Sequence, residues 1–151
     1  MSFMNCDKTM RIMIVNEEKK CLEAERELLC GVVPDAEIGC TDSPVKALEL
    51  AEKETFDVII TEAMMEQMHG MILARKIFQK KRRTNIIFFA DTKEYALDAI
   101  RMFVSDYLLK PVSKERLRLS LKNLRYPVGG HRADGNRGRG TAAPILKSMI
   151  R

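Results

Sequence analysis

The stretch Asp57-Val-Ile-Ile-Thr-Glu-Ala-Met-Met65 begins with a short apolar run and ends in polar and flexible side chains. Four similar runs lie before and after it along the chain, at Arg11–Val15, Ala36–Cys40, Ile86–Phe89 and Asp106–Leu109. Together with Asp57–Thr61 they predict five strands, because short apolar runs bounded by polar or turn residues are typical of strands buried on both faces.

The segments between these runs carry apolar residues at the three- and four-residue spacing of amphipathic helices. Ser113 is expected to cap the last of these helices, although Arg116 stands where a full capping box has an acidic residue. Regular alternation of strands and helices predicts the α/β class, a doubly wound five-stranded parallel sheet of the flavodoxin-like type. The five helices are marked by Leu22, Leu28 and Leu29; Val45, Leu48 and Ala51; Ile72, Leu73, Ile77 and Phe78; Tyr95, Ala99, Ile100 and Phe103; and Leu117, Leu121 and Leu124.

The composition indicates one globular domain. The chain has 151 residues, of which 46% are hydrophobic, and this is enough for a single core without disulfides or metal. The four cysteines form no C-x-x-C pair and no apolar leader precedes Arg11, so we expect reduced thiols and a cytoplasmic protein. No apolar run approaches the roughly 20 residues that span a bilayer, so no membrane association is expected.

The domain limits follow from the pattern of apolar residues and glycines. Residues 1–10 are expected to be a lead-in, residues 11–125 the folded domain, and residues 126–151 a disordered tail rich in glycine and arginine. The tail holds five basic residues and one acidic residue, which accounts for most of the net charge of +5. A nearly neutral body with a basic tail is weak evidence for nucleic-acid binding.

Parallel sheets of this type bind ligands outside the carboxyl ends of their strands. The residues expected at that edge are Asn16–Glu18, Glu62–Met65, Ala90–Thr92 and Lys110–Pro111. A ligand-binding or catalytic site is therefore expected among these four segments.

Three blocks of sequence resemble the signature blocks of response-regulator receiver domains. They are Arg11-Ile-Met-Ile-Val-Asn-Glu-Glu18, Asp57-Val-Ile-Ile-Thr-Glu-Ala-Met-Met65 with Met68-His69-Gly70, and Asp106-Tyr-Leu-Leu-Lys-Pro-Val112. They occur in the order and at the spacing of that family, over about residues 11–125. The resemblance implies a module of two-component signal transduction, and it is stronger for the fold than for the activity.

The resemblance places Glu62 at the position of the phosphate-accepting aspartate. The extra methylene moves the carboxylate by more than about 1 Å, and a displacement of that size can lower the rate about 100-fold. Lys110 matches the lysine that stabilises negative charge on the phosphoryl group, and an ion pair between Lys110 and Glu62 would close the pocket. The bond before Pro111 is expected to be cis, as is usual in the family.

The acidic pair that holds Mg²⁺ in the family corresponds to Asn16 and Glu17, so one negative charge is missing. Glu17, Glu62 and the carbonyl of Met64 are the remaining candidate ligands. We expect Mg²⁺ binding to be weak or absent, and no cofactor to be required. Asn16 has a second interpretation, as a loop residue that bonds its own backbone.

The family's switch hydroxyl corresponds to Ala90, which cannot donate a hydrogen bond, whereas Thr92 is expected outside the pocket. Tyr107 stands at the aromatic switch position, and an ordinary packing role for it is equally supported. Lys80-Lys-Arg-Arg83 is interpreted as a solvated helix end, with nucleic-acid contact as the less favoured alternative.

The leading hypothesis is an atypical receiver, not an enzyme, with impaired phosphorylation, that acts through protein contacts. Its expected surface for a partner or for a homodimer is the fourth helix, fifth strand and fifth helix, near Tyr95, Phe103 and Tyr107. One alternative is a working acceptor of phosphate from a histidine kinase, on Glu62 or Thr61. Another is the regulatory part of a transcription regulator, and DNA binding is expected only in that larger context.

Overall fold

The computed structural model describes residues 9–128 and leaves residues 1–8 and 129–151 undescribed. Its sheet has the strand order β2-β1-β3-β4-β5, and every neighbouring pair is parallel. The predicted fold class, a doubly wound five-stranded parallel sheet, is therefore confirmed. The strands are β1 (Arg11–Val15), β2 (Glu37–Thr41), β3 (Val58–Glu62), β4 (Asn85–Ala90) and β5 (Asp106–Leu109).

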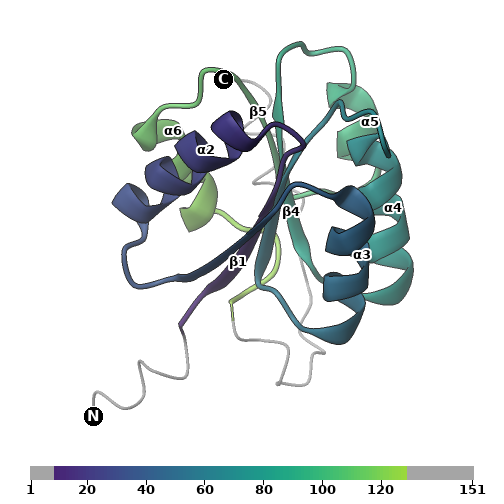
Figure 1. Cartoon of the computed structure of the whole chain (residues 1–151), viewed down its shortest axis with the longest axis horizontal. Coiled ribbons are helices and arrows are strands. Elements are labelled where there is room, and N and C mark those ends of the chain that lie inside the picture. Colours follow the sequence, from purple (N-terminus) through teal and green to yellow (C-terminus); the bar gives the residue numbers. More distant parts are fainter. Residues whose placement is uncertain (1–8, 129–151) are drawn as a thin grey trace.

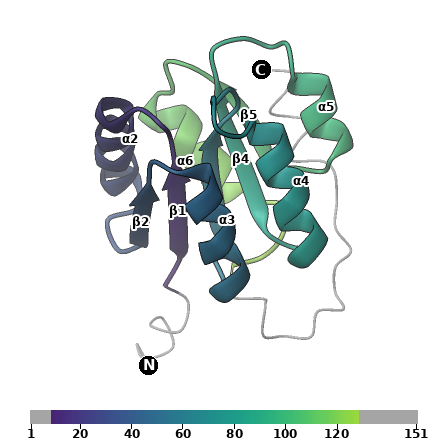
Figure 2. The same ribbon diagram turned by 45° about the vertical axis from the view of Figure 1, so that its right-hand side comes forward.

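The helices form a layer on each face of the sheet (Figure 1). The layer of α2 and α6 lies on one face and that of α3, α4 and α5 on the other, as the turned view in Figure 2 also shows. The strand order reverses between β1 and β3, so their carboxyl ends form the switch point at which such sheets bind ligands. The helices are α2 (Lys19–Val32), α3 (Pro44–Lys53), α4 (Gly70–Lys80), α5 (Ala96–Arg101) and α6 (Lys114–Lys122).

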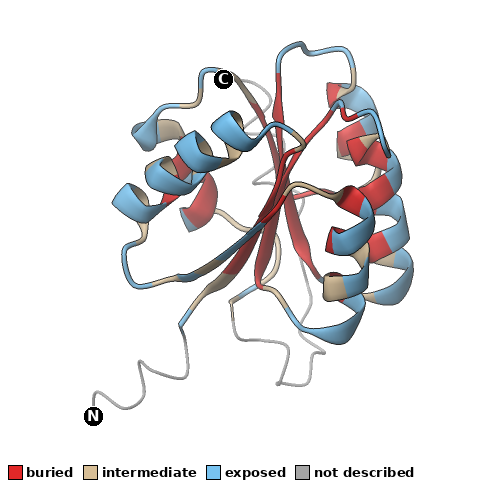
Figure 3. Cartoon of the chain, viewed as in Figure 1, coloured by how far each residue is buried: buried red, intermediate tan, exposed pale blue. Residues whose placement is uncertain are grey.

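Two hydrophobic clusters, one on each face, make up the core. Successive residues of a strand point to opposite faces, so Ile12 and Ile14 belong to the cluster beneath α2 and α6, whereas Met13 and Val15 pack under α3 and α4. The strands β3 and β4 are buried along their whole length, as Figure 3 shows. This double burial explains why the strands appear in the sequence as continuous apolar runs.

The helix ends follow local side-chain chemistry. The hydroxyl of Ser113 accepts a hydrogen bond from the backbone N–H of Arg116, which confirms the predicted cap of α6. The α5 helix ends at Arg101, two residues before the apolar pattern ends at Phe103, because Phe103 adopts a left-handed φ of 66°. The apolar pattern therefore extends two residues beyond the end of the helix.

The described chain extends past the predicted domain limit at residue 125. Tyr126, which the sequence assigned to the tail, donates its backbone N–H to Asn85 Oδ1 and accepts from Asn85 Nδ2. Tyr126 thus belongs with the folded part, whereas most of the predicted tail lies outside the described residues. Among residues 9–128, no helix is long and apolar enough to cross a membrane.

Candidate functional site

An open cavity of about 800 Å³ lies at the carboxyl edge of the sheet. The loop after β1, the end of β3 and the residue that follows β5 contribute to its wall, as the parallel arrangement requires. Ala90, at the end of β4, lies beside them and accepts a backbone hydrogen bond from Lys110. The structure therefore gathers the sequence-predicted positions at one edge. The cavity-lining residues are Asn16, Glu17, Glu18, Cys21, Glu62, Met64, Met65, Glu66, Asp91 and Lys110.

Glu62 is the centre of this site and is only 7% exposed. Its Oε1 accepts a hydrogen bond of 3.1 Å from Asn16 Nδ2, and its Oε2 forms an ion pair with Lys110 Nζ. The predicted ion pair between Lys110 and Glu62 is therefore present. Both oxygens of the carboxylate face protein donors, and one of these donors is a cation.

Burial raises the pKa of the Glu62 carboxyl, and the hydrogen bond and charge of Lys110 oppose that rise. Burial alone would lower the pKa of Lys110, but its contacts with Glu62 outweigh burial and raise it. The ammonium therefore stays charged at neutral pH, where it neutralises Glu62. A buried carboxylate with its own counter-charge needs no metal ion for compensation.

Glu25, on α2, is a member of this network that the sequence analysis did not identify. Asn16 Nδ2 also donates to Glu25 Oε2 at 3.1 Å, so one amide links two carboxylates. Burial, followed by the charge of Glu62, raises the pKa of Glu25 to about 7. A sequence signal existed, because Glu25 lies three residues after Leu22 and four before Leu29, on the apolar stripe of α2.

Glu17 binds the loop that follows β3. Its Oε1 and Oε2 accept hydrogen bonds of 2.7 Å from the backbone N–H groups of Glu66 and Gln67 respectively. Asn16 bonds its own loop as well, because its Oδ1 accepts from the N–H of Glu18 at 2.9 Å. The alternative interpretation of Asn16 is thus observed, and it coexists with the contact to Glu62.

The two candidate Mg²⁺ carboxylates, Glu17 and Glu62, do not fit the metal as they are placed. Both oxygens of Glu17 accept hydrogen bonds from backbone N–H groups, and Glu62 has an ammonium at one oxygen and an amide at the other. Mg²⁺ needs near-octahedral oxygen ligands, whereas residues 9–128 contain no cluster of three His, Cys, Asp or Glu suited to a metal.

The two switch positions lie on the adjacent strands β4 and β5, where Tyr107 pairs with Phe88 and Ala90 with Leu109, and neither is among the residues that line the cavity. Ala90 is buried, and its methyl group stands where receiver domains carry the switch hydroxyl. Tyr107 is also buried, and its hydroxyl donates to the carbonyl of Thr92 at 2.7 Å. Burial raises the pKa of Tyr107. The loop after β4 is therefore fastened to β5 through Tyr107.

The remaining sequence candidates also have defined positions. The Lys110–Pro111 peptide bond is cis, as predicted. Thr61, the alternative phosphate acceptor, is 1% exposed and its hydroxyl donates to the carbonyl of Glu62, so a phosphoryl donor has no access to it. His69 precedes α4 and its Nδ1 accepts from the N–H of Met71, which makes it the helix cap.

Acidic side chains outnumber basic ones around the cavity. Five carboxylates line it, and Lys110 is the one basic side chain among its lining residues. Lys110 Nζ also lies 3.8 Å from Oδ1 of Asp91, the residue that follows Ala90. A phosphoryl donor is an anion, so this excess of negative charge opposes its approach. The carboxylates are those of Glu17, Glu18, Glu62, Glu66 and Asp91.

Comparisons with known proteins agree with this placement. A family model described as the response regulator receiver domain matches residues 12–122. An uncharacterised response regulatory protein of Vibrio cholerae is 27% identical over 131 residues, which is 86% of this chain and 50% of that protein. The sensory transduction protein LytR of Staphylococcus epidermidis is 30% identical over 115 residues, 76% of this chain and 46% of that protein.

A solved receiver domain protein from Clostridium thermocellum has a similar fold. It has a TM-score of 0.70 and 23% identity, and the match covers 76% of this chain and 92% of that one. The chain spans about half the length of the curated relatives it matches. The family model covers most of the chain, and the described fold is that of the family's solved structures. The chain therefore belongs to the response regulator receiver domain family of two-component signal transduction.

Proposed function

We propose that this chain is an atypical receiver module that signals through protein contacts and accepts phosphate poorly or not at all. The observation that carries the proposal is the carboxylate of Glu62, buried between Asn16 and Lys110. A nucleophile must present a free oxygen in line with the incoming phosphorus. Both oxygens of Glu62 instead face neighbouring donors, and one of them is the lysine that would stabilise the transferred group.

Two further departures support the same proposal. Glu17 is occupied by the loop backbone, so the charge that would hold Mg²⁺ and attract the donor is directed elsewhere. Ala90 offers no hydroxyl to a phosphoryl group, and the following loop is fastened by Tyr107 instead. Weak or absent Mg²⁺ binding and a fixed loop together remove the usual trigger of the receiver switch.

The test is intact-protein mass spectrometry after incubation with acetyl phosphate and Mg²⁺. Wild type is expected to gain no phosphoryl group. The matched control is the Asn16→Asp, Glu62→Asp, Ala90→Thr variant, which restores the family's charge, reach and hydroxyl and is expected to gain a hydroxylamine-labile group. Labelling of wild type at Glu62 would contradict the proposal and restore the alternative of phosphate transfer from a histidine kinase.

The proposed contact surface is formed by α5, β5 and α6, for a protein partner or a second copy. Leu97 on α5 and Leu119 on α6 are 59% and 40% exposed, which supports an apolar contact there. Tyr107, which was expected near this surface, is buried on β5 and would contribute to it only through packing beneath the exposed side chains. A Leu97→Glu variant is expected to lower the dimer fraction in sedimentation, whereas Val45→Glu on α3 serves as the control.

A second candidate function is the regulatory part of a transcription regulator. It is favoured by the length of the relatives, of which the match covers only about half, and which include the transcriptional regulatory protein BtsR of Salmonella typhimurium. Such a role needs an output domain outside this chain. Sequencing the genomic region around the coding sequence would show whether an output domain follows in frame.

A further inference from the structure

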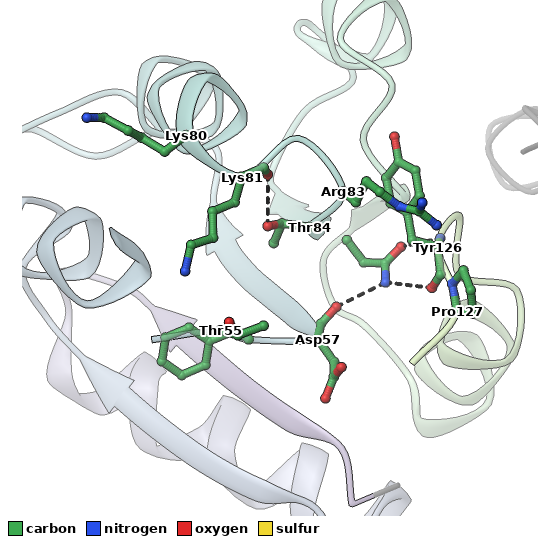
Figure 4. A pocket seen from close by; sticks show the side chains of 10 residues that line it. Thr55, Asp57, Lys80, Lys81, Arg83, Thr84, Tyr126 and Pro127 are labelled. Atoms are coloured by element: carbon green, nitrogen blue, oxygen red, sulfur yellow. Dashed lines mark hydrogen bonds between the residues drawn. The ribbon is translucent and has the colours of Figure 1, made fainter. Parts of the chain in front are cut away.

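The opposite edge of the sheet, where the strands begin, carries two neighbouring cavities that share Tyr126. The first, of about 300 Å³, lies between the starts of β3 and β4 and the chain after α6 (Figure 4). The second, of about 470 Å³, lies between α4 and the end of α5. We call the cations and rings that line both cavities the amino-edge surface: Phe56, Arg75, Phe78, Lys80, Lys81, Arg82, Arg83, Phe103 and Tyr126.

A buried polar network fixes Tyr126 at the centre of the amino-edge surface. Asn85, which is 2% exposed, makes two hydrogen bonds with the Tyr126 backbone. The hydroxyl of Ser105 donates to Asn85 Oδ1 and accepts from the N–H of Arg125. The backbone of Tyr126 is therefore fastened to β4 through Asn85.

Guanidinium groups and aromatic rings alternate across this surface. The Arg83 guanidinium lies 5.4 Å from the centre of the Tyr126 ring, and Figure 4 shows the two side by side. Arg125 lies 5.9 Å from the same ring and 4.8 Å from that of Phe103. Four planar groups thus form an ordered row that crosses both cavities.

Cations without a carboxylate partner surround this row. Arg75, Lys80 and Arg82 are exposed, and none of them forms an ion pair with a carboxylate of residues 9–128. Surface cations of this kind keep their full charge for an external anion. The sequence run Lys80–Arg83 is thus part of a larger positive surface that includes Arg75 from the preceding turns of α4.

Phe103 is placed unusually for an aromatic residue. It adopts a φ of 66°, a left-handed conformation that is unfavourable for a residue with a Cβ, and it is 54% exposed. Core burial therefore gives little compensation for this backbone cost. The ring instead faces the second cavity beside Arg125.

We propose that the amino-edge surface binds single-stranded nucleic acid. Exposed cations that track a phosphodiester backbone, combined with rings on which unpaired bases stack, are the features that recognise this polymer without base sequence. Arginine fits phosphate oxygens with two parallel hydrogen bonds, and three of the cations that line the cavities are arginines. An acidic protein segment would form ion pairs with the cations but has no bases to stack on the rings.

The chain that follows supports this choice. Beyond Val128, residues 129–151 contain five basic residues and one acidic residue, among them the run Gly135-Asn-Arg-Gly-Arg-Gly140. Segments rich in arginine and glycine bind single strands through charge and stacking.

The test is fluorescence anisotropy of the full chain with labelled single strands of oligo-dT and oligo-U, each roughly 15 nucleotides long. Measurements at about 0.1 M salt are compared for wild type, Arg75→Glu/Arg82→Glu and Phe103→Gly. Phe103→Gly removes a ring and also relieves the left-handed backbone, so a folding defect is not expected to mask its effect. The charge control is Lys20→Glu/Lys46→Glu, which changes net charge equally at exposed positions of α2 and α3.

The arginine pair variant is expected to weaken binding about 10- to 100-fold, and Phe103→Gly about fivefold or more, with little effect of the control. Binding that survives both changes would overturn the proposal, because residues 129–151 would then hold the polymer alone. Equal affinity for duplex DNA or poly-glutamate would also overturn it, because neither presents bases that stack on the rings. Absence of any binding would do the same.

Discussion

The carboxyl group of Glu25 is held in a place that favours its protonated form. Its pKa is raised from 4.5 to about 7, first by burial and then by the charge of Glu62. The unfolded chain releases this proton near pH 4.5, whereas the folded chain keeps it to about pH 7. The folded state thus binds more protons in that window, and its stability falls as pH rises through it.

Glu25→Gln is therefore expected to stabilise the protein by about 1–2 kcal/mol at pH 8 and by nothing measurable at pH 4.5. The amide keeps an oxygen for Asn16 and removes the charge. Urea unfolding at both pH values measures the difference. Glu23→Gln, an exposed position on the same helix, is the control, and a gain for Glu25→Gln that is equal at both pH values would refute the explanation.

Lys110→Met removes the counter-charge of Glu62. We expect a loss of about 2–4 kcal/mol at pH 7.5, because a buried carboxylate is left without compensation. The loss should shrink as the pH falls, because the pKa of the buried Glu62 carboxyl is raised and protonation removes its charge, and the double variant with Glu62→Gln should recover most of it. Lys19→Met, which breaks a contact of 4.0 Å at an exposed lysine, is expected to cost under about 0.5 kcal/mol.

Single residues also show where sequence reasoning reached its limit. The ion pair of Lys110 with Glu62 followed from their positions at the ends of neighbouring signature blocks. The direction of Glu17 did not, because its side chain reaches the N–H groups of Glu66 and Gln67, almost fifty residues later in the chain. Such a contact between two loops depends on the backbone path of both loops. The spacing of apolar residues in the sequence does not predict that path.

The start of α4 packs closely against the end of β3. A Cβ added to Gly70 would lie 2.2 Å from the carbonyl oxygen of Glu62, which is backbone and has no room to yield. Gly70→Ala is therefore expected to cost about 2–4 kcal/mol and to displace the end of β3 that carries Glu62. Thermal and urea unfolding measure the loss.

Gly39→Ala is the matched control for this element. Gly39 lies on β2, and a Cβ there meets nothing within 4 Å. The alanine should be neutral or slightly stabilising, because glycine in a strand carries an entropic cost. Equal losses for both variants would show that the close approach of α4 to β3 is not the cause.

Elements as a whole were predicted well, and their ends were not. All five strands and all five helices lie where the apolar patterns place them, and the signal is strongest for β3 and β4, which are buried along their whole length. Each of β2, β3 and β4 nevertheless ends one residue later than predicted. Glu62 is thus part of β3, a position that hydrogen bonding to β4 decides and that residue types alone do not encode.

Over the whole molecule, Asn85 connects the sheet to the chain after α6. Its Nδ2 donates hydrogen bonds to the carbonyls of Asp57 and Tyr126. Its Oδ1 accepts hydrogen bonds from the hydroxyl of Ser105 and the backbone N–H of Tyr126. Asn85→Ala is expected to cost about 3 kcal/mol, since several buried polar groups lose their partners together. Hydrogen exchange should show increased exchange of the Tyr126 amide. Asn123→Ala, which removes one local bond to Leu119, should cost under about 1 kcal/mol.

The charged side chains that line the cavities differ between the two edges of the sheet, mostly carboxylates at one edge and mostly cations at the other. Carboxylates surround the cavity at the carboxyl edge, where the helices begin, and cations gather at the amino edge, where they end. The last turns of α3, α4, α5 and α6 contain Lys53, Lys80, Arg101 and Lys122 respectively. Each such cation compensates the partial negative charge of its helix end, so the arrangement also contributes to stability.

The cavities at the two ends of the strands therefore present mainly opposite charges to the solvent. Approaching macromolecules experience this polarity before they touch the surface, at distances comparable to the Debye length. A negatively charged partner is attracted to the amino edge of this protein. A positively charged partner is attracted to the cavity that holds Glu62. Encounter orientation is thus determined before any contact forms, and added salt weakens this selection equally for both edges.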